Sequence, residues 1–388
     1  MIYLDHAATT PVDPRVFEVV SQSMRRDFAN PGAVYRIGLD AANRVEKARE
    51  EIATLLRLPA SYRIIFTSGG SESNNLFIKG NAGKKAACLG LEHPSVTAPL
   101  ALAEEKGGEI LSGFQKEGRL DPAKISELGR HRIRLLCLSH VNNELGSIND
   151  PGEIAPILKS DAPKVRLFLD GVQAVGKIRF TPAFWDGVAG YSVSAHKING
   201  PKGIGLLIYD SRFPLAPQIH GGQQQFGIRS GTLPVPLILG LAEALKLALE
   251  RTDETRVHLG KLRCRLIEGL QDLSRRLPNL RLRFNSSVSP DHQSPAIVNF
   301  SFPPVEGEVL LHHLEEKDIF VGTGSACSAQ SKKPSKILTG IGLSTEEARC
   351  SLRVSFGRQN TVEEVDVFLK EFARAYEALY PTFSRKVG

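Results

Sequence analysis

The sequence predicts an α/β protein with a mostly parallel central sheet and a second, smaller α/β domain. Between about residues 62 and 209, short β-rich apolar runs alternate with helix-like segments, which is typical of a parallel sheet flanked by helices. The 388 residues exceed what one hydrophobic core usually organises, so we expect two domains. With 41% hydrophobic and 23% charged residues, the composition fits a chain that buries a large core and excludes a disordered or fibrous protein.

The strands of the large sheet are expected to be buried on both faces. Runs such as LLCL at 135–138 and VRLFL at 165–169 are almost continuously apolar, as in the central strands of α/β proteins. The expected strands span residues 63–67, 85–90, 133–139, 165–170, 190–194 and 205–209.

A long helix is expected after these strands. From Pro236 to about residue 277 no further proline interrupts a pattern of apolar residues at helical spacing, and such a helix can bridge two domains. Pro278 ends the pattern. Beyond it, the sequence predicts strands at 281–284, 296–302 and 352–356 and helices at 306–316 and 361–380.

Charge and cysteine content limit the classes of partner. Lys and Arg (49) exceed Asp and Glu (42), giving +7, but the basic residues are scattered, so a basic solvated surface is favoured and no nucleic acid is expected. The five cysteines are odd in number, widely spaced and without a CxxC pair, which argues against a disulfide framework or a metal site. These features, a start without a signal peptide and no membrane-length apolar stretch predict a cytoplasmic protein.

The most informative segment is a polar, glycine-rich loop at 192–203 (SVSAHKINGPKG) between two apolar runs. Loops at the carboxyl ends of parallel strands are where α/β proteins bind ligands. Lys197 in this loop could be an ordinary solvated lysine. In a packed loop, however, a lysine can lose its proton and form a Schiff base with an aldehyde. Pyridoxal phosphate (PLP) is the cofactor that uses such a lysine.

PLP makes two further demands that the sequence can meet. Its ring nitrogen needs a carboxylate beside it, and Asp170 ends an apolar strand, although Asp in this position is more often a helix N-cap. Its phosphate needs a cradle, and Gly70 and Ser71 lie where a strand leads into a helix whose N-H groups and dipole favour an anion. A Ser-rich helix cap is the plainer interpretation of this turn.

Seven motifs, in order along the chain, resemble those of the cysteine desulfurases, which are PLP enzymes of the class V aminotransferase group. They are 3–11 (YLDHAATTP), 67–75 (TSGGSESNN), 92–93 (EH), 142–146 (NNELG), 194–197 (SAHK), 229–232 (RSGT) and 324–327 (GSAC). The resemblance implies the PLP-dependent transferase fold type I, like that of aspartate aminotransferase. It also implies a large PLP-binding domain at 15–255 and a small domain of 1–14 plus 256–388 that carries the catalytic cysteine loop.

The resemblance also implies a role for each residue of the site. Lys197 would bind PLP covalently, Asp170 would partner the ring nitrogen, and Gln173 and Asn143 would contact the hydroxyl side of the ring. His93 would stack on the ring and help to move protons, where the alternative is a histidine that caps a loop. The implied phosphate ligands are Gly70, Ser71, Ser194, His196 and, from the other subunit of a homodimer, Thr232.

The reaction type depends on Cys327. Its surroundings at 321–334 are small and polar with two lysines close behind, which favours a thiolate. Cys88 and Cys137 lie in apolar strands and are expected to be inert, and Cys264 lies on the long helix. Cys350 is the one rival, because it lies three residues before Arg353.

The resemblance implies that L-cysteine is the substrate, with its carboxylate held by Arg353 and Asn30. Lys197 would remove the α-proton, and Cys327 would take the sulfur as a persulfide and leave alanine. An acceptor protein for iron-sulfur cluster assembly or tRNA thiolation would receive the sulfur. A selenocysteine lyase, another PLP-dependent lyase or aminotransferase, and a non-catalytic scaffold of this fold are the alternatives. Tyr35 stands where family members often have a histidine.

Overall fold

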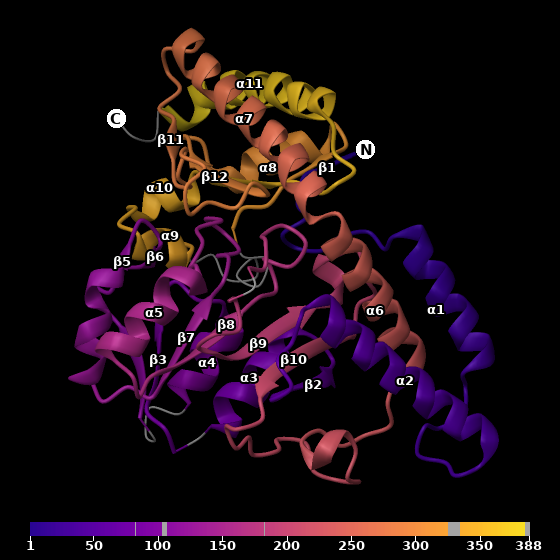
Figure 1. Cartoon of the computed structure of the whole chain (residues 1–388). Coiled ribbons are helices and arrows are strands. Elements are labelled where there is room, and N and C mark those ends of the chain that lie inside the picture. The colour runs from indigo at the N-terminus through magenta and orange to yellow at the C-terminus, as the bar shows by residue number, and fades with distance from the viewer. Residues whose placement is uncertain (82, 103–106, 182, 325–333, 385–388) are drawn as a thin grey trace.

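A seven-stranded sheet lies at the centre of the larger part of the molecule (Figure 1). The computed structural model describes residues 1–81, 83–102, 107–181, 183–324 and 334–384. Strand β10 is antiparallel to both of its neighbours, and the other pairs are parallel, as the sequence predicts for a mostly parallel sheet. In spatial order the strands are β2 (Tyr62–Thr67), β10 (Gly205–Asp210), β9 (Val188–Ser194), β8 (Arg166–Asp170), β7 (Leu135–Ser139), β3 (Ala86–Leu89) and β4 (Gly108–Leu111).

Alternate side chains of each strand enter two separate hydrophobic cores, because successive side chains point to opposite faces of a sheet. On β7, Leu136 and Leu138 belong to one core, whereas Leu135 and Cys137 belong to the other. All five residues of β7 are therefore buried. The apolar runs of the sequence reflect this burial on both faces.

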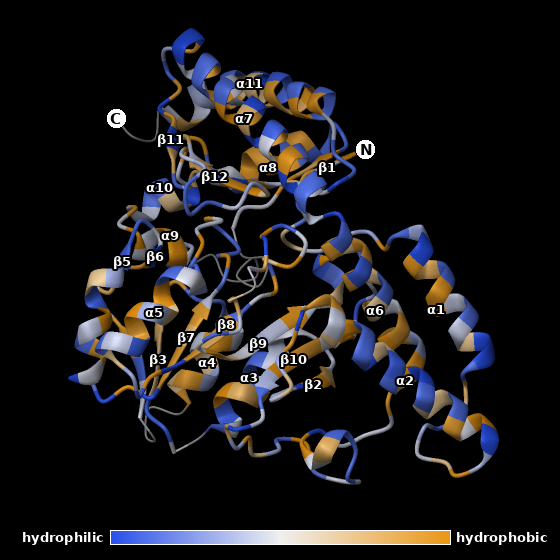
Figure 2. Ribbon diagram, in the orientation of Figure 1, coloured by the Kyte–Doolittle hydropathy of each residue, from blue (hydrophilic) through white to orange (hydrophobic). Residues whose placement is uncertain are grey.

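Helices cover both faces of the sheet. Helices α3 (Gly70–Gly80) and α4 (Pro94–Ala101) contribute to one core. The other core receives side chains from α1, α2, α5 and α6, and Figure 2 shows the hydrophobic residues of the sheet enclosed between helices whose outer faces are hydrophilic. These helices are α1 (Pro14–Arg26), α2 (Arg36–Leu55), α5 (Pro151–Asp161) and α6 (Val235–Glu250).

The smaller part has its own sheet and its own core. Strand β12 lies between β11 and β14 in an antiparallel sheet, and the N-terminal strand β1 pairs in parallel with β13. This core also includes Leu4 and Ala7, so the first residues pack with the C-terminal part of the chain (Figure 1). The division at residues 15 and 255 stays a prediction. The elements are β1 (Ile2–Tyr3), α7 (Thr252–Arg276), β11 (Arg283–Phe284), β12 (Ile297–Ser301), α8 (Gly307–Glu315), β13 (Ile319–Phe320), β14 (Ser351–Ser355) and α11 (Val362–Ser384).

The long helix expected from residue 236 to 277 is two helices. Arg251 has φ −105° and ψ 12°, which ends α6 and begins α7. Asp253 and Glu254 lie in the first turn of α7, where acidic side chains favour a helix start. No proline or glycine marks this break, so the apolar spacing did not reveal it.

Short elements complete the fold. The hairpin of β5 (Gln115–Lys116) and β6 (Arg119–Leu120) and the edge strand β4 were not expected from the sequence. The remaining short helices are η2 (Pro122–Gly129), η3 (Ala195–Lys197), η4 (Gln225–Gly227), α9 (Lys336–Gly340) and α10 (Thr345–Arg349). Within the described parts of the chain, no helix has the length and apolar character needed to cross a membrane.

Candidate active site

A cavity of about 280 Å³ lies at the edge of the large sheet where β7, β8 and β9 end. Ser139 at the end of β7 is in register with Asp170 at the end of β8, and Thr67 and Ser194 both pair with Gly205 of β10. The loops after these strands therefore open on one side. Of the residues assigned to the site from the sequence, the cavity is lined by Gly70, Ser71, His93, Asn143, Asp170, Gln173, Ser194, His196, Lys197 and Arg353.

Asp170 is a buried carboxylate held by three donors. Its Oδ1 accepts from the backbone N-H of Val172 at 3.0 Å and from Ser192 Oγ at 3.4 Å, and its Oδ2 accepts from Asn74 Nδ2 at 2.7 Å. Asn74 also donates to Ser95 Oγ at 2.8 Å. Asn74 and Ser95 line the cavity too. The only sequence signals for these two residues were that Asn74 belongs to the motif at 67–75 and that Ser95 lies two residues after His93.

Lys197 projects from η3 toward the N-terminal segment of the chain. Its Nζ donates to the carbonyl oxygens of Ala7 at 2.6 Å and Ala8 at 2.5 Å. Residues 3–11 therefore reach the site although they lie almost 190 residues away in the sequence. The amine that is expected to react is held at one place by two acceptors.

His93 is both a helix cap and a cavity residue. It precedes α4, and its Nδ1 accepts from the Ser95 backbone N-H at 3.1 Å and contacts Ser95 Oγ at 2.8 Å. Burial lowers the pKa of His93, and the Lys197 cation lowers it further against the opposing effect of Asp170. The imidazole is therefore neutral near pH 7, with its proton on Nε2.

One end of the cavity lies at the start of α3, where Gly70 and Ser71 line it. A Cβ built on Gly70 would lie 2.5 Å from Val172 Cγ2. The backbone at residue 70 can therefore lie this close to the Val172 side chain only because the residue is glycine. Glu72 in the first turn pairs with Arg229 at 2.8 Å. Although burial raises the pKa of Glu72, hydrogen bonds from Arg229 and Ser68 lower it more. This pair ties the segment 229–232 to α3.

His196 lies in an electropositive part of the same cavity. Burial, and after it the positive charges of Lys197, Lys202 and Lys177, lower its pKa to about 4. Its Nδ1 lies 3.1 Å from Thr9 Oγ1. The cations that oppose protonation of His196 would attract an anionic ligand group.

Arg353 lies in the middle of β14 and is 2% exposed. Its NH2 pairs with Asp5 at 2.7 Å, and its NH1 donates to the Asn143 carbonyl oxygen at 2.9 Å. Its Nε is buried and has no hydrogen-bond partner among the described residues. The pairing of Asp5 with Arg353 could not be predicted from the sequence, because 348 residues separate them.

Three residues assigned from the sequence do not line this cavity. Asn30 is exposed, and its Oδ1 accepts from the Gly32 N-H within its own loop. Thr232 is exposed on the segment after η4. Cys327 lies outside the described residues. Their roles therefore stay predictions.

The other four cysteines do not line the cavity either. Burial raises the pKa of Cys88 and of Cys137 far above that of an exposed thiol, and nearby Glu92 adds to the effect. Burial, followed by Glu346 and Glu306, raises the pKa of Cys350 to about 12. Cys264 is exposed on α7. Cys350 therefore lacks the thiolate character that a nucleophile needs.

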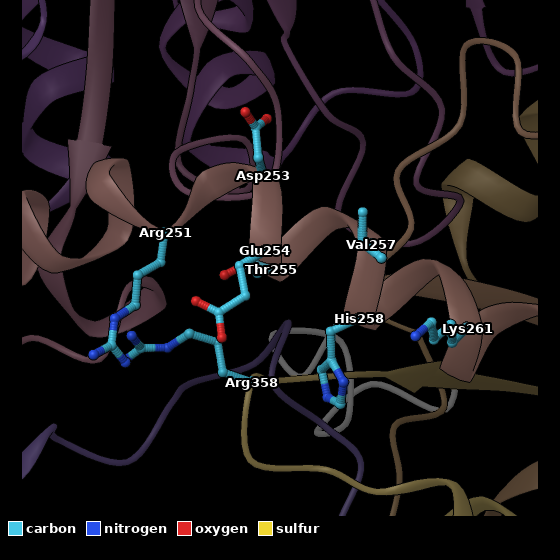
Figure 3. A pocket seen from close by; sticks show the side chains of 8 residues that line it. All are labelled: Arg251, Asp253, Glu254, Thr255, Val257, His258, Lys261 and Arg358. Atoms are coloured by element: carbon cyan, nitrogen blue, oxygen red, sulfur yellow. The ribbon is translucent and has the colours of Figure 1, made fainter.

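A second, larger cavity of about 620 Å³ lies where α7 begins (Figure 3). Acidic Asp253 and Glu254 and basic Arg251, Lys261 and Arg358 all line it. Asp253 already pairs with Arg179. The residues that line this second cavity include neither a carboxylate at the end of a strand, such as Asp170, nor a glycine at the start of a helix, such as Gly70. No cluster of metal-ligating side chains occurs within the described ranges.

Comparisons with known proteins agree with the geometry. The model of the aminotransferase class-V family matches residues 2–368. A protein of Photobacterium profundum called cysteine desulfurase IscS is 38% identical, with 97% of this chain and 93% of that protein aligned. A protein of the same name from Vibrio atlanticus is 40% identical over the same shares.

Solved structures give the same result. A NifS-like protein has a TM-score of 0.87 and 31% identity, covering 97% of this chain and all of its own. A NifS-like protein from Rickettsia africae has a TM-score of 0.85 and 30% identity, covering 97% and 99%. A structure described as SspA in complex with cysteine has a TM-score of 0.74 and 31% identity, covering 92% and 99%.

Proposed function

This chain is a cysteine desulfurase of the aminotransferase class-V family, and we propose that it binds PLP in the cavity at the sheet edge and transfers the sulfur of L-cysteine to Cys327. The observation that carries the proposal is the convergence of Asp170, Lys197 and the start of α3 on one cavity. The fold is that of PLP-dependent transferases of fold type I, and an enzyme of this family uses PLP.

The residues present fit this cofactor. The Asp170 carboxylate would hold the ring nitrogen protonated, and the Lys197 amine would bond the aldehyde. The open N-terminus of α3 at Gly70 and Ser71, together with Ser194 and His196, would hold the phosphate. His93 would lie against the ring, and Gln173 and Asn143 would contact its hydroxyl. When bound, PLP supplies an electron sink that stabilises negative charge on the substrate α-carbon.

The substrate would be oriented by its carboxylate. Arg353 is buried at the cavity wall and presents a planar guanidinium, which suits bidentate binding of a carboxylate. Asn30 would assist. The amine of Lys197, once released by the substrate amine, would accept the α-proton. Neutral His93 would hold or pass on a proton at Nε2.

The sulfur would then move to Cys327. A bond forms between the Cys327 thiolate and the substrate sulfur as the substrate C-S bond breaks. The electron pair of that bond remains on the carbon side, which takes up a proton to become alanine, and the sulfur remains as a persulfide. The raised thiol pKa of Cys88, Cys137 and Cys350 supports Cys327 as the nucleophile.

The persulfide would be passed to an acceptor protein for iron-sulfur cluster assembly or tRNA thiolation. We also propose a homodimer, in which Thr232 completes the phosphate site of the partner subunit. Support comes from the exposed position of Thr232 and from the exposed apolar side chains of Phe28, Val34 and Tyr35 on one loop. The described cysteines form no disulfide, which fits work in the reducing cytoplasm.

The test uses the purified protein with L-cysteine and a thiol reductant. Alanine and sulfide should form in equal amounts. The Cys327→Ser variant should keep the visible absorption band of the lysine-bound cofactor yet release no sulfide, because only the final nucleophile is lost. A matched Cys264→Ser variant should behave as the unmodified protein, since Cys264 is exposed on α7 away from the cavity.

A second measurement locates the persulfide. After exposure to L-cysteine without reductant, the tryptic peptide that contains Cys327 should gain one sulfur atom. Alanine production by Cys327→Ser with a labelled Cys350 peptide would move the nucleophile to Cys350. Alanine production with no labelled cysteine would favour a lyase instead. A preparation that binds no PLP would contradict the proposal as a whole.

A further inference from the structure

Besides Lys197, a second buried amine lies near the cavity at the sheet edge, which is called the ligand cavity below. Lys177 follows Gly176 in the turns after β8, and it is 8% exposed. Both Lys177 and Lys197 line a small cavity of about 30 Å³, together with His6, Thr10 and other residues. A space of this size holds one or two water molecules. The reaction proposed above uses neither Lys177 nor this space.

A chain of hydrogen bonds links the two lysines. Lys177 Nζ donates to Gln173 Oε1 at 3.3 Å, and Gln173 Nε2 donates to the Ala7 carbonyl oxygen at 2.8 Å. The same carbonyl oxygen accepts from Lys197 Nζ at 2.6 Å. All four residues are at least partly buried, so solvent does not replace these contacts freely.

Lys177 and the Ala7 carbonyl oxygen together set the orientation of the Gln173 amide. An ammonium group only donates, and a carbonyl oxygen only accepts. With the amide turned over, its NH2 group would face the Lys177 amine and its oxygen would face the Ala7 carbonyl oxygen. Only the observed orientation satisfies both neighbours. The Ala7 carbonyl oxygen alone already favours this orientation, and Lys177 adds a second group that favours it from the other side of the amide.

The charge of Lys177 also acts on Lys197. Burial, and after it the positive charge of Lys197, lower the pKa of Lys177 to about 7. The repulsion between two cations is mutual, so a protonated Lys177 opposes a proton on the Lys197 nitrogen by the same interaction. A neighbouring cation is a known means of keeping an amine reactive.

We propose that Lys177 is a positioning residue for Lys197, which holds the Gln173 amide and the Ala7 carbonyl in place and opposes protonation of the Lys197 nitrogen by its charge. The proposal rests on the proposed function, since it assumes that Lys197 binds PLP.

Other titratable or charged groups face Lys197 as well, and the test must leave them unchanged. On the side of the small cavity they are His6 and Arg358. On the side of the ligand cavity they are His93, Asp170, His196 and Arg353. None of them is altered in the variants below.

The experiment titrates the visible absorption band of the lysine-bound cofactor with pH. In Lys177→Met and Lys177→Gln the midpoint should move to higher pH by about one unit, because loss of a nearby cation makes protonation of the Lys197 nitrogen easier. That shift is a tenfold change in the protonation equilibrium. Lys177→Arg keeps the charge and should keep the midpoint. Lys164→Met, at an exposed lysine before β8, is the matched control.

The outcomes separate this inference from the proposed function. An unmodified protein without the band would contradict the proposed function. A normal band whose midpoint is the same in the unmodified protein, Lys177→Met and Lys177→Gln would overturn the inference. Lys177→Gln keeps a polar group for Gln173, so it remains usable if the methionine variant does not fold. A purely structural role for Lys177 would change stability without moving the midpoint.

Discussion

At the scale of single residues, the site is made of groups whose charges are balanced by distant parts of the chain. Arg353 is buried against Asp5, and Glu72 is paired with Arg229. Breaking a buried pair leaves an uncompensated charge, which costs far more than a surface pair is worth. Asp5 therefore compensates the charge of Arg353 at the cavity wall.

The carboxylate of Asp170 is expected to act on turnover rather than on folding. Asp170→Asn keeps the size of the side chain but removes the charge, so we expect a folded protein whose kcat falls by several orders of magnitude. Ser192→Ala is the control, because it removes only the 3.4 Å hydrogen bond to Asp170. Steady-state alanine formation measures both variants. Near-normal turnover of Asp170→Asn would mean that another group partners the ring.

The sequence predicted which residues meet in the site better than it predicted what holds them. Asp170 and Lys197 could be assigned together because both follow β-rich runs, and parallel strands bring their carboxyl ends to one edge. The Ala7 and Ala8 carbonyl groups that hold Lys197 could not be predicted, because this contact depends on how the N-terminal segment packs. Asp5 was missed for the same reason.

At the scale of elements, burial decided what could be predicted. The strands β7, β8 and β9 are buried on both faces, so their apolar runs were plain in the sequence. The edge strand β4 is only partly buried and gave no such run. The break between α6 and α7 at Arg251 is marked by no proline or glycine, so apolar spacing alone did not predict it.

Two glycines of α7 should respond oppositely to alanine. A Cβ at Gly260 would meet nothing within 4 Å, so Gly260→Ala should stabilise the fold by about 0.5 to 1 kcal/mol through helix propensity. A Cβ at Gly269 would lie 2.2 Å from Leu369 Cδ1 on α11, so Gly269→Ala should destabilise it by about 1 to 3 kcal/mol. Chemical denaturation measures both changes. Equal effects of the two substitutions would contradict this packing of α7 on α11.

At the scale of the whole molecule, buried histidines make stability depend on pH. Burial lowers the pKa of His140 to about 4, and burial and the Lys177 cation lower that of His6 to about 4. The unfolded chain binds protons at these positions below about pH 6.5, whereas the folded protein does not until about pH 4. The free energy of unfolding should therefore fall as pH decreases from about 6.5 to 4, by up to about 3 kcal/mol for each histidine.

Denaturant unfolding at a series of pH values measures this loss. His140→Asn removes one titrating group and should flatten the slope in that window. His312→Asn, at an exposed histidine of α8, should leave it unchanged. Carboxylates with lowered pKa such as Glu72 begin to lose their contribution only below about pH 4.5, the ordinary value for Glu, so most of that loss lies below the histidine range. A slope that is identical in His140→Asn would contradict a buried neutral His140.

The last prediction concerns the assembly. If Thr232 completes the phosphate site of the partner subunit, two inactive variants should restore activity when they share a dimer. Thr232→Asp places a negative charge where the phosphate is expected and Lys197→Ala removes the reactive amine, so each homodimer is inactive. In a mixed dimer, one site combines an intact Lys197 with an intact Thr232 from the other subunit.

Co-expression of the two variants in equal amounts makes half of the dimers mixed, each with one working site, so activity should reach about one quarter of that of the unmodified protein. Mixing the separately purified variants without subunit exchange is the control and should give none. If Thr232 served the cavity of its own chain, every site in the mixed dimer would carry one defect, and co-expression would restore nothing. The measurement thus decides whether a site in one subunit depends on the other. We expect that it does, because Thr232 lies exposed outside the cavity of its own chain.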